Sequence, residues 1–325
     1  MIDIKEFESI IQSAENILIT AHTYPDADAI CSSQLMKIII KKQFDKDCDI
    51  CVAGKIGRLL RPFCQEINTI KHTSKTYDLV ICLDASDLTR IGDLKISFEK
   101  AKQTINIDHH YTNSKFATLN IVDTDASSTA EILYSICNEY YKSIMDLEIA
   151  KFAYAGIMTD TNGLMTNNIN APTYKIIADI VSTGLNVDII KNYFFKSYSK
   201  AKLQILGRAL NSLSFYNNNI AVISVRKTDF IECCASFDDT LGVVDYALNC
   251  YQIDIAIAII EQNTNEFYIS LRSKKSNVAN IANKFGGGGH TNASAFQYSG
   301  KIEEIFEELI NSCNDTNLTK IKLKY

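Results

Sequence analysis

Acidic and histidine side chains follow apolar runs at four places in the sequence. Carboxylates that meet in one site repel each other unless cations lie between them, and buried charge without a partner is strongly unfavourable. Mixed carboxylate and imidazole ligands suit manganese, iron or zinc better than calcium or magnesium. The stretches AHTYPDADA, VICLDASD, INIDHH and AGIMTDTNG therefore predict a site for divalent metals, built from His22, Asp26, Asp28, Asp84, Asp108, His109, His110 and Asp160.

Each stretch taken alone has a simpler interpretation. A lone His22 is more often a structural histidine held by a hydrogen bond, and Asp84 could cap the helix that follows it. The residues DHH could form a solvated turn, and TDTNG resembles an ordinary turn sequence. All four stretches occur together, each at the end of an expected strand or helix, and this combination favours the metal site.

The elements that must position these side chains alternate between strands and helices in the first half of the chain. This alternation predicts an α/β fold, with a parallel sheet covered by helices on both faces. In such a sheet, ligands gather at the carboxyl ends of the strands. We expect strands at 16–22, 48–53, 77–85, 103–110 and 117–123, and helices at 127–142, 146–159 and 171–184.

The pattern changes after residue 185, and the 325 residues are enough for two domains. We predict a metal-binding domain over 1–187, a helical hinge over 188–212 and a smaller α/β domain with a mixed sheet over 213–325, with a cleft between the two domains. Expected elements of the smaller domain are strands at 219–225, 253–262 and 266–273 and an amphipathic helix at 302–313.

Four consecutive glycines, Gly286, Gly287, Gly288 and Gly289, precede His290. Glycines allow positive φ angles and a close approach of the backbone to a ligand, and the N–H groups of such a loop can bind a phosphate. The alternative is a flexible linker. Because the loop is flanked by predicted helix and strand, we predict a phosphate-binding site that also includes His290, Ser273 and Arg272, since arginine suits bidentate recognition of phosphate.

Together these motifs resemble the DHH family of phosphoesterases. The resemblance is carried by HTYPDADAICSS, DASDLTRIG, DHH at 108–110 and TDTNG around Asp160, and LRSKKSNVANIANKFGGGGHTNASAF resembles the DHH-associated C-terminal domain. It extends from about residue 10 to about residue 300. It implies a site for two divalent ions, with Mn²⁺ as the expected metal.

The resemblance also implies a role for each residue of the site. Asp108 would orient a neighbouring histidine, and His110 would face the phosphate. A water or hydroxide between the ions would be the nucleophile. Asp84 would be shared between the two ions, one held by His22, Asp26 and Asp84, the other by Asp28, Asp84, His109 and Asp160.

Composition limits the class of substrate. The net charge is −5, with 33 Lys and Arg against 38 Asp and Glu, which argues against binding of long duplex nucleic acid. The sequence contains no apolar run of about 18 residues or more, so it predicts no membrane span. Its first residues do not resemble a secretory signal. The ten cysteines are scattered, as expected for free thiols in a reducing compartment. We therefore predict a cytoplasmic protein.

The resemblance implies hydrolysis of very short oligoribonucleotides, such as pGpG or pApA, to mononucleotides, and conversion of adenosine 3′,5′-bisphosphate to AMP. Short RNA oligonucleotides or nucleotides would be the substrates, and exposed apolar strand edges favour a homodimer. Three alternatives stay open: a single-strand exonuclease, a manganese pyrophosphatase, and a nucleotide sensor without catalysis. The glycine-rich segment argues against the pyrophosphatase.

Overall fold

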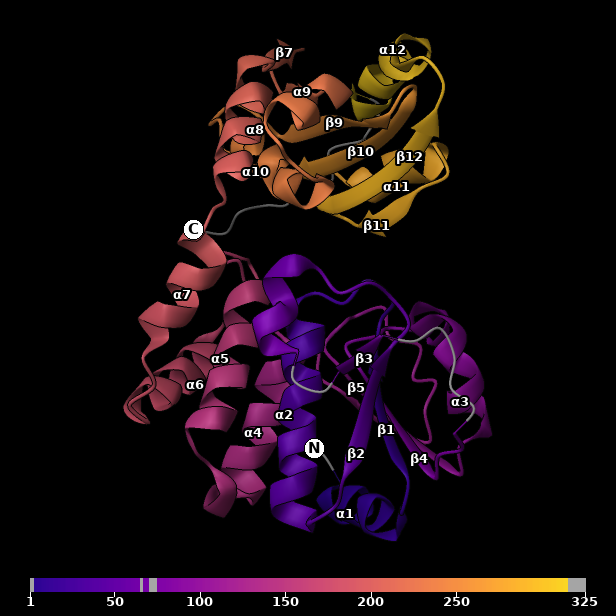
Figure 1. The fold of residues 1–325 in the computed structure, drawn as a ribbon, viewed down its shortest axis with the longest axis vertical. Coiled ribbons are helices and arrows are strands. Elements are labelled where there is room, and N and C mark those ends of the chain that lie inside the picture. The colour runs from indigo at the N-terminus through magenta and orange to yellow at the C-terminus, as the bar shows by residue number, and fades with distance from the viewer. Residues whose placement is uncertain (1–2, 65–66, 70–74, 315–325) are drawn as a thin grey trace. The chain divides into compact units, whose positions relative to one another are not determined.

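The chain forms two compact units, residues 1–197 and 198–325, each with its own sheet and its own core (Figure 1). The structure is a computed structural model, and it describes residues 3–64, 67–69 and 75–314. Within these residues, no helix combines the length and the apolar character that a membrane crossing requires. The cleft expected between the two units stays a prediction.

The first unit contains a six-stranded sheet in which all neighbouring strands are parallel. Its central strands consist of uninterrupted apolar runs, such as ILITA and LVICL, and every residue of these two runs is buried. Such runs are typical of a parallel sheet that is covered on both faces. The strand order is β3 (Ile67–Thr69), β2 (Cys48–Val52), β1 (Ile17–Ala21), β4 (Leu79–Leu83), β5 (Gln103–Asp108) and β6 (Leu119–Val122).

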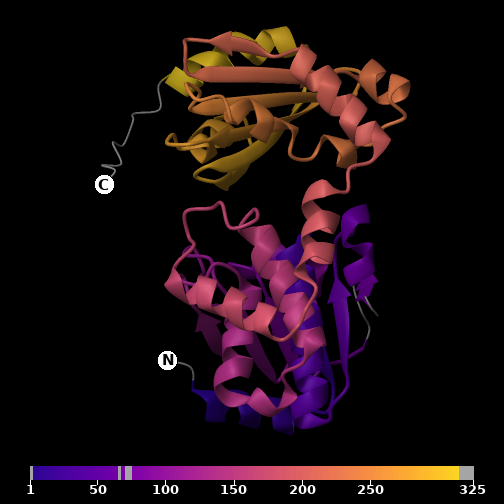
Figure 2. The same ribbon diagram turned by 90° about the vertical axis from the view of Figure 1, so that its left-hand side faces the viewer.

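Helices cover both faces of this sheet, as predicted. Ile17 and Ile19 belong to the core shared with α1 (Ile4–Ser13), α2 (Ala27–Phe44), α4 (Thr129–Tyr140) and α5 (Leu147–Asp160). The intervening Leu18 packs in a second core with η2 (Leu88–Leu94) and α3 (Lys95–Lys100). Helices α2, α4 and α5 lie side by side (Figures 1 and 2). Successive strand residues point to opposite faces, so one apolar run supplies both cores.

Shorter elements complete the first unit. They are η1 (Arg58–Phe63), η3 (Lys142–Ile144), α6 (Ala171–Ser182) and α7 (Val187–Lys196). Residues 188–212, predicted as a hinge, form α7 and α8 (Lys200–Asn211). Ile190 of α7 is buried in the core of the first unit, whereas Ile205 of α8 is buried in a core of the second. The predicted domain limits stay predictions.

The second unit contains a mixed sheet, as predicted. Only the β8–β9 pair is parallel among the described strand pairs of this sheet. The order is β11 (Gly288–His290), β12 (Ala293–Ser299), β10 (Glu266–Ser273), β9 (Ile255–Asn263), β8 (Ile220–Val225) and β7 (Ser214–Tyr216). One face packs with α8, α9 (Lys227–Glu232), η4 (Phe237–Thr240) and α10 (Val243–Leu248), the other with α11 (Val278–Lys284) and α12 (Ile302–Asn314).

The glycine-rich segment differs from the expected loop. Gly288 and Gly289 lie in the edge strand β11, where they pair with Ala295 and Ser294 of β12. The prediction of a loop over all four glycines is therefore wrong for Gly288 and Gly289. Glycine has a low strand propensity, so the strand comes from the antiparallel pairing with β12 and not from a local signal.

Candidate metal centre

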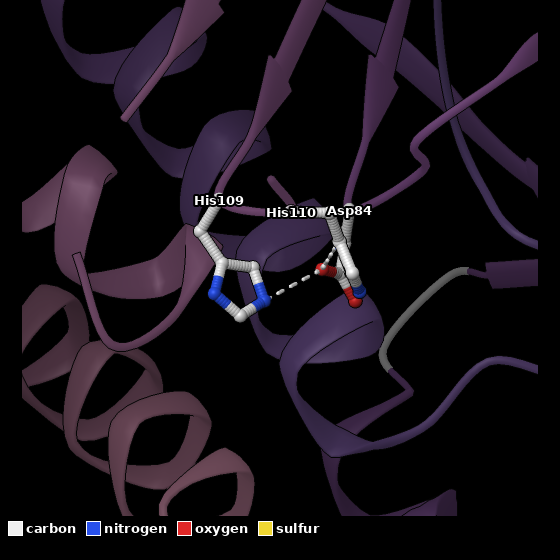
Figure 3. Close-up of side chains that lie close together, drawn as sticks. All are labelled: Asp84, His109 and His110. Atoms are coloured by element: carbon white, nitrogen blue, oxygen red, sulfur yellow. Dashed lines mark ion pairs between the residues drawn. The ribbon is translucent and has the colours of Figure 1, made fainter. Parts of the chain in front are cut away.

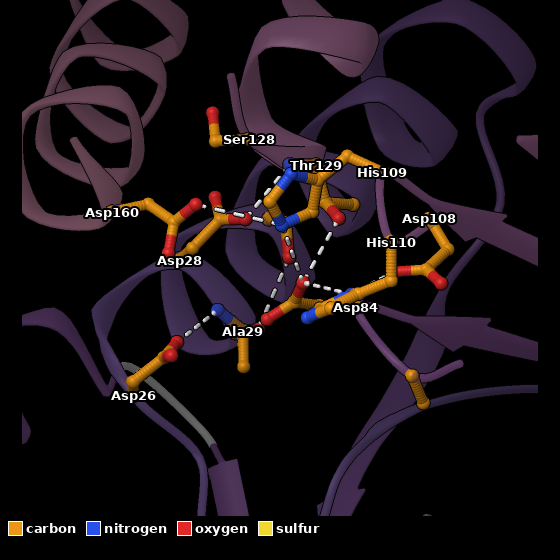
Figure 4. Close-up of polar contacts among 12 residues, drawn as sticks. Asp26, Asp28, Ala29, Asp84, Asp108, His109, His110, Ser128, Thr129 and Asp160 are labelled. Carbon is orange, nitrogen blue, oxygen red and sulfur yellow. Dashed lines mark hydrogen bonds and ion pairs between the residues drawn. The ribbon is translucent and has the colours of Figure 1, made fainter. Parts of the chain in front are cut away.

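The structure brings together the six predicted metal ligands and the two further predicted site residues, Asp108 and His110. They lie at the carboxyl ends of β1, β4 and β5, at the start of α2 and at the end of α5. Figure 4 labels all of them except His22. Three neighbouring parallel strands end at the same edge of the sheet, and this topology explains why residues far apart in the sequence meet. The residues are His22, Asp26, Asp28, Asp84, Asp108, His109, His110 and Asp160.

Asp84 lies between two histidines. Its Oδ2 atom is 3.6 Å from Nε2 of His22. Its Oδ1 atom is 3.6 Å from Nε2 of His109 (Figure 3). The residue is buried and adopts a φ angle of +54°, and its backbone N–H donates to the carbonyl oxygen of Ile107 at 3.0 Å. A positive φ angle costs energy in a residue other than glycine, and such residues cluster at functional sites.

Three groups of ligand atoms are compact enough to hold a metal ion, since the atoms of each group lie within 4.8 Å of one another. Carboxylate oxygens and imidazole nitrogens are suitable donors for a divalent cation, so the chain has acidic and histidine groups positioned to bind a metal. The assignment of individual ligands stays a prediction. The groups are His22, Asp26 and Asp84; Asp28, His109 and Asp160; and Asp84, His109 and His110.

The pKa values reflect the mutual repulsion of these carboxylates. Burial, followed by the neighbouring charges of Asp84 and Asp160, raises the pKa of Asp28 well above its usual value. Desolvation and the charges of Asp26 and Asp84 likewise raise the pKa of Asp160. Burial alone would raise the pKa of Asp84, but the imidazoles of His22 and His109 lower it below its usual range. A cation bound among these groups would offset the repulsion.

Asp108 and His110 form a second set of contacts at the same edge. The Nδ1 atom of His110 lies 2.7 Å from Oδ1 of Asp108, which is fully buried. The Nδ2 group of Asn113 donates to Oδ2 of Asp108 at 2.6 Å and to Oδ1 of Asn106 at 2.7 Å. Burial lowers the pKa of His110, but the carboxylates of Asp108 and Asp84 outweigh that effect and raise the pKa to about 9.

The contacts of Asn113 and Thr129 were not predicted from the sequence. The Oγ1 group of Thr129 donates to Oδ1 of Asp84 at 3.2 Å, and its backbone N–H donates to Oδ2 of Asp28 at 2.7 Å. Asn113 lies three residues after the DHH stretch, so its position was visible in the sequence. Thr129 lies in the expected helix start SST, which indicates a helix cap but not a contact with the site.

The substrate-binding residues predicted in the second unit have other contacts there. The Nε atom of Arg272 lies 3.6 Å from Oδ1 of Asp245, and Nη1 donates to the carbonyl oxygen of Leu271 at 3.1 Å. Ser273 is buried, and its hydroxyl donates to the carbonyl oxygen of Ser276. The side chain of His290 lies outside the described residues. The role of these residues, and of Gly286 to Gly289, stays a prediction.

Comparison with protein families gives two matches that follow the two units. Residues 16–157 match the DHH family, N-terminal domain, and residues 217–315 match the DHHA1 domain. The chain belongs to the DHH family. The DHH match spans all of the predicted metal ligands except Asp160, which lies three residues beyond its end.

Relatives of this DHH-family chain are similar over nearly their full length. A crystal structure of an exopolyphosphatase-related protein from Bacteroides fragilis is 30% identical, with 95% of each chain covered and a TM-score of 0.88. A bifunctional oligoribonuclease and PAP phosphatase NrnA from Mycoplasma genitalium is 27% identical over 95% of this chain and 96% of its own. A probable enzyme of the same name from Streptococcus mutans is 26% identical over 93% and 96%. The chain is a phosphoric ester hydrolase of the DHH family.

Proposed function

We propose that this DHH-family hydrolase cleaves very short oligoribonucleotides, such as pGpG or pApA, to mononucleotides, and converts adenosine 3′,5′-bisphosphate to AMP. The observation that carries the proposal is the position of Asp84 between His22 and His109, 3.6 Å from each, with further carboxylates around them. The names of the Mycoplasma genitalium and Streptococcus mutans relatives support a short nucleotide as the substrate.

The proposed cofactor is a pair of divalent ions, with Mn²⁺ as the expected metal. Bound divalent ions supply Lewis-acid activation of the phosphate and lower the pKa of a bound water. The mixed oxygen and nitrogen donors support this choice of metal. Asp84 would be shared, one ion being held by His22, Asp26 and Asp84 and the other by Asp28, Asp84, His109 and Asp160.

In this proposal His110 binds the phosphate through its positive charge. The contact with the carboxylate of Asp108 favours the charged form of the imidazole, and a charged ring can offset the charge of a phosphate oxygen. Asp108 fixes the orientation of the ring through the 2.7 Å contact with Nδ1. Asn113 in turn holds the other oxygen of Asp108.

The second unit is proposed to bind a phosphate of the nucleotide. Arg272 is the principal candidate, because one-third of its side chain is exposed, at 33%, and a guanidinium can bind a phosphate with two hydrogen bonds. Ser273, Gly286 to Gly289 and His290 are further candidates. A cytoplasmic location and a homodimer stay predictions, the second testable by light scattering of the purified protein.

The function is tested with purified full-length protein, Mn²⁺ and a panel of substrates. The panel contains pApA, pGpG, a longer oligoribonucleotide, adenosine 3′,5′-bisphosphate and pyrophosphate, with products separated by chromatography. We expect mononucleotides from the two dinucleotides and AMP from the bisphosphate. Asp84→Asn should abolish turnover, whereas Asp47→Asn should not, since the Asp47 side chain is 90% exposed and pairs with Lys41.

Other outcomes identify other functions. Preference for the longer oligomer would indicate an exonuclease, and release of phosphate from pyrophosphate alone would indicate a pyrophosphatase. Tight binding of nucleotide without turnover would indicate a sensor. Each of these results would overturn the proposed function.

A further inference from the structure

The first turn of α4 contacts two of the predicted metal ligands, although none of its residues belongs to the motifs of the site. The Thr129 hydroxyl donates to Oδ1 of Asp84 at 3.2 Å. Both oxygens of Asp28 accept backbone N–H groups of the same turn. Oδ2 accepts that of Thr129 at 2.7 Å (Figure 4), and Oδ1 accepts that of Ala130 at 3.0 Å. One short turn therefore contacts two carboxylates, that of Asp28 in the first turn of α2 and that of Asp84 directly after β4.

Helix capping does not explain the Thr129 hydroxyl. Ser128 is the N-cap of α4, and its hydroxyl accepts the backbone N–H of Glu131 at 3.1 Å. Thr129 is the next residue, and its hydroxyl is directed to Asp84 instead of to the helix. Thr129 is fully buried, so a hydroxyl at this position has to be satisfied by a specific partner.

The turn itself is held by a buried carboxylate. Glu131 accepts hydrogen bonds from the backbone N–H of Ser127 at 3.1 Å and from the hydroxyl of Thr173 at 3.0 Å. The carbonyl oxygen of Ser127 accepts the amide group of Asn168 at 3.2 Å. These contacts tie the start of α4 to the start of α6. They restrict the movement of the first turn of α4, and therefore of the groups that contact Asp28 and Asp84.

The geometry points to Thr129 as a positioning residue of the metal centre: its hydroxyl orients the carboxylate of Asp84, while its backbone N–H orients that of Asp28. This inference rests on the proposed metal site. Asp84 also combines a positive φ angle with burial, and residues with such backbone conformations cluster at functional sites. Residues that hydrogen-bond a metal ligand orient it and contribute to metal affinity.

The experiment compares Thr129→Ser with Thr129→Ala in the full-length protein. Both variants lose the methyl group, and they differ only by the hydroxyl. Thr129→Val, which keeps the shape, is a third variant. Thr104→Val is the matched control, because Thr104 is a buried threonine of β5 whose hydroxyl contacts Thr118 away from the site. The readouts are the Mn²⁺ dissociation constant by titration calorimetry, the melting temperature without metal, and turnover at increasing Mn²⁺.

We expect Thr129→Ser and Thr104→Val to bind Mn²⁺ like the wild type, and Thr129→Ala and Thr129→Val to bind it on the order of 10-fold more weakly. Excess Mn²⁺ should restore much of the turnover of the two weak variants. Equal affinity of the Ser and Ala variants would overturn the positioning role, and so would a loss confined to the melting temperature. If the wild type binds no Mn²⁺, the proposed function itself fails, which is a separate result.

Discussion

The Nδ1 atom of His110 lies 2.7 Å from the Oδ1 atom of Asp108. Although burial lowers the pKa of His110, the negative charge of Asp108 helps raise it to about 9. We expect Asp108→Asn to lower the pKa of His110 substantially. The measurement is an NMR titration of the imidazole signals, with Asp93→Asn, which changes an exposed aspartate, as the control.

This contact also predicts a pH dependence of stability. A histidine whose pKa is raised in the folded state stabilises the protein below its unfolded pKa of about 6.5, and the contribution is lost as the pH rises through the folded value. The wild type should therefore exceed Asp108→Asn in melting temperature most clearly below about pH 6.5. The difference should shrink as the pH approaches 9. A difference that does not change with pH would contradict the predicted ion pair.

The loop that carries His22 depends on a glycine in another loop. A Cβ atom added at Gly54 would lie 1.2 Å from the carbonyl oxygen of Thr23. Thr23 is also held from the other side, since its N–H donates to the carbonyl oxygen of Arg90 at 2.7 Å. Gly54→Ala should displace the loop and lower turnover by about 10²-fold, as expected for a shift of about 1 Å at a catalytic site.

Gly57→Ala is the matched control for this substitution. A Cβ atom added at Gly57 would meet no atom of the described residues within 4 Å, its chain neighbours aside, so turnover should stay at the wild-type level. Steady-state kinetics of both variants decide the question. Equal turnover of the two variants would mean that the loop tolerates displacement at Thr23.

The residues that form the site could be predicted from the sequence because each follows a strong local pattern. Buried runs such as LVICL predict parallel strands, and a polar residue directly after such a run lies at the ligand-binding edge of the sheet. Asp84 was predicted on this basis. The short strands β3 and β7 were missed, because three residues are too few to show a periodic pattern.

The contacts that support the site could not be predicted in this way. Thr129 meets Asp28 across 101 positions of the sequence, because α2 and α4 pack side by side. The pairing of Gly289 with Ser294 likewise depends on an edge strand that glycine does not favour. Local patterns carry no information on which helices become neighbours, and both features are set by tertiary packing.

Gly156 of α5 allows close packing beside Asp28. A Cβ atom at Gly156 would lie 2.5 Å from Cβ of Ala130 and 2.7 Å from Oδ1 of Asp28. Gly156→Ala should therefore destabilise the protein by about 1–3 kcal/mol, the usual cost of overpacking a core. It should also weaken Mn²⁺ binding, because Asp28 has to move. Denaturant unfolding followed by circular dichroism measures the first effect, and calorimetric titration the second.

A helical glycine elsewhere gives the opposite expectation. Among the residues that the structure describes, none outside the backbone of α8 lies within 4 Å of a Cβ atom added at Gly207. Gly207→Ala should therefore stabilise its unit by about 0.5–1 kcal/mol through helix propensity alone. Mn²⁺ affinity should not change. Similar stabilisation by Gly156→Ala would show that α5 can move away from Asp28 without cost.

Asp160 should oppose folding in the absence of metal. Desolvation and the charges of Asp26 and Asp84 raise its pKa. A carboxyl group with a raised folded pKa costs stability above that pKa, and the cost disappears as the pH falls and the group is protonated. Asp160→Asn should therefore melt at a higher temperature than the chelator-treated wild type at neutral pH. This advantage should disappear as the pH falls below about 3.9, the pKa of an ordinary aspartate, because the carboxyl then becomes protonated in both states.

Addition of Mn²⁺ should reverse this order. A ligand that binds only the folded state stabilises it by about 2.7 kcal/mol at a concentration 100-fold above its dissociation constant. The wild type should gain melting temperature with Mn²⁺, and Asp160→Asn should gain much less, because one ligand of the proposed site is lost. Asp47→Asn, whose carboxylate is exposed, should respond like the wild type. An equal gain in all three proteins would place the Mn²⁺ site elsewhere. If instead Asp160→Asn melts above the wild type without metal and below it with Mn²⁺, the repulsion among these carboxylates is relieved by the bound metal.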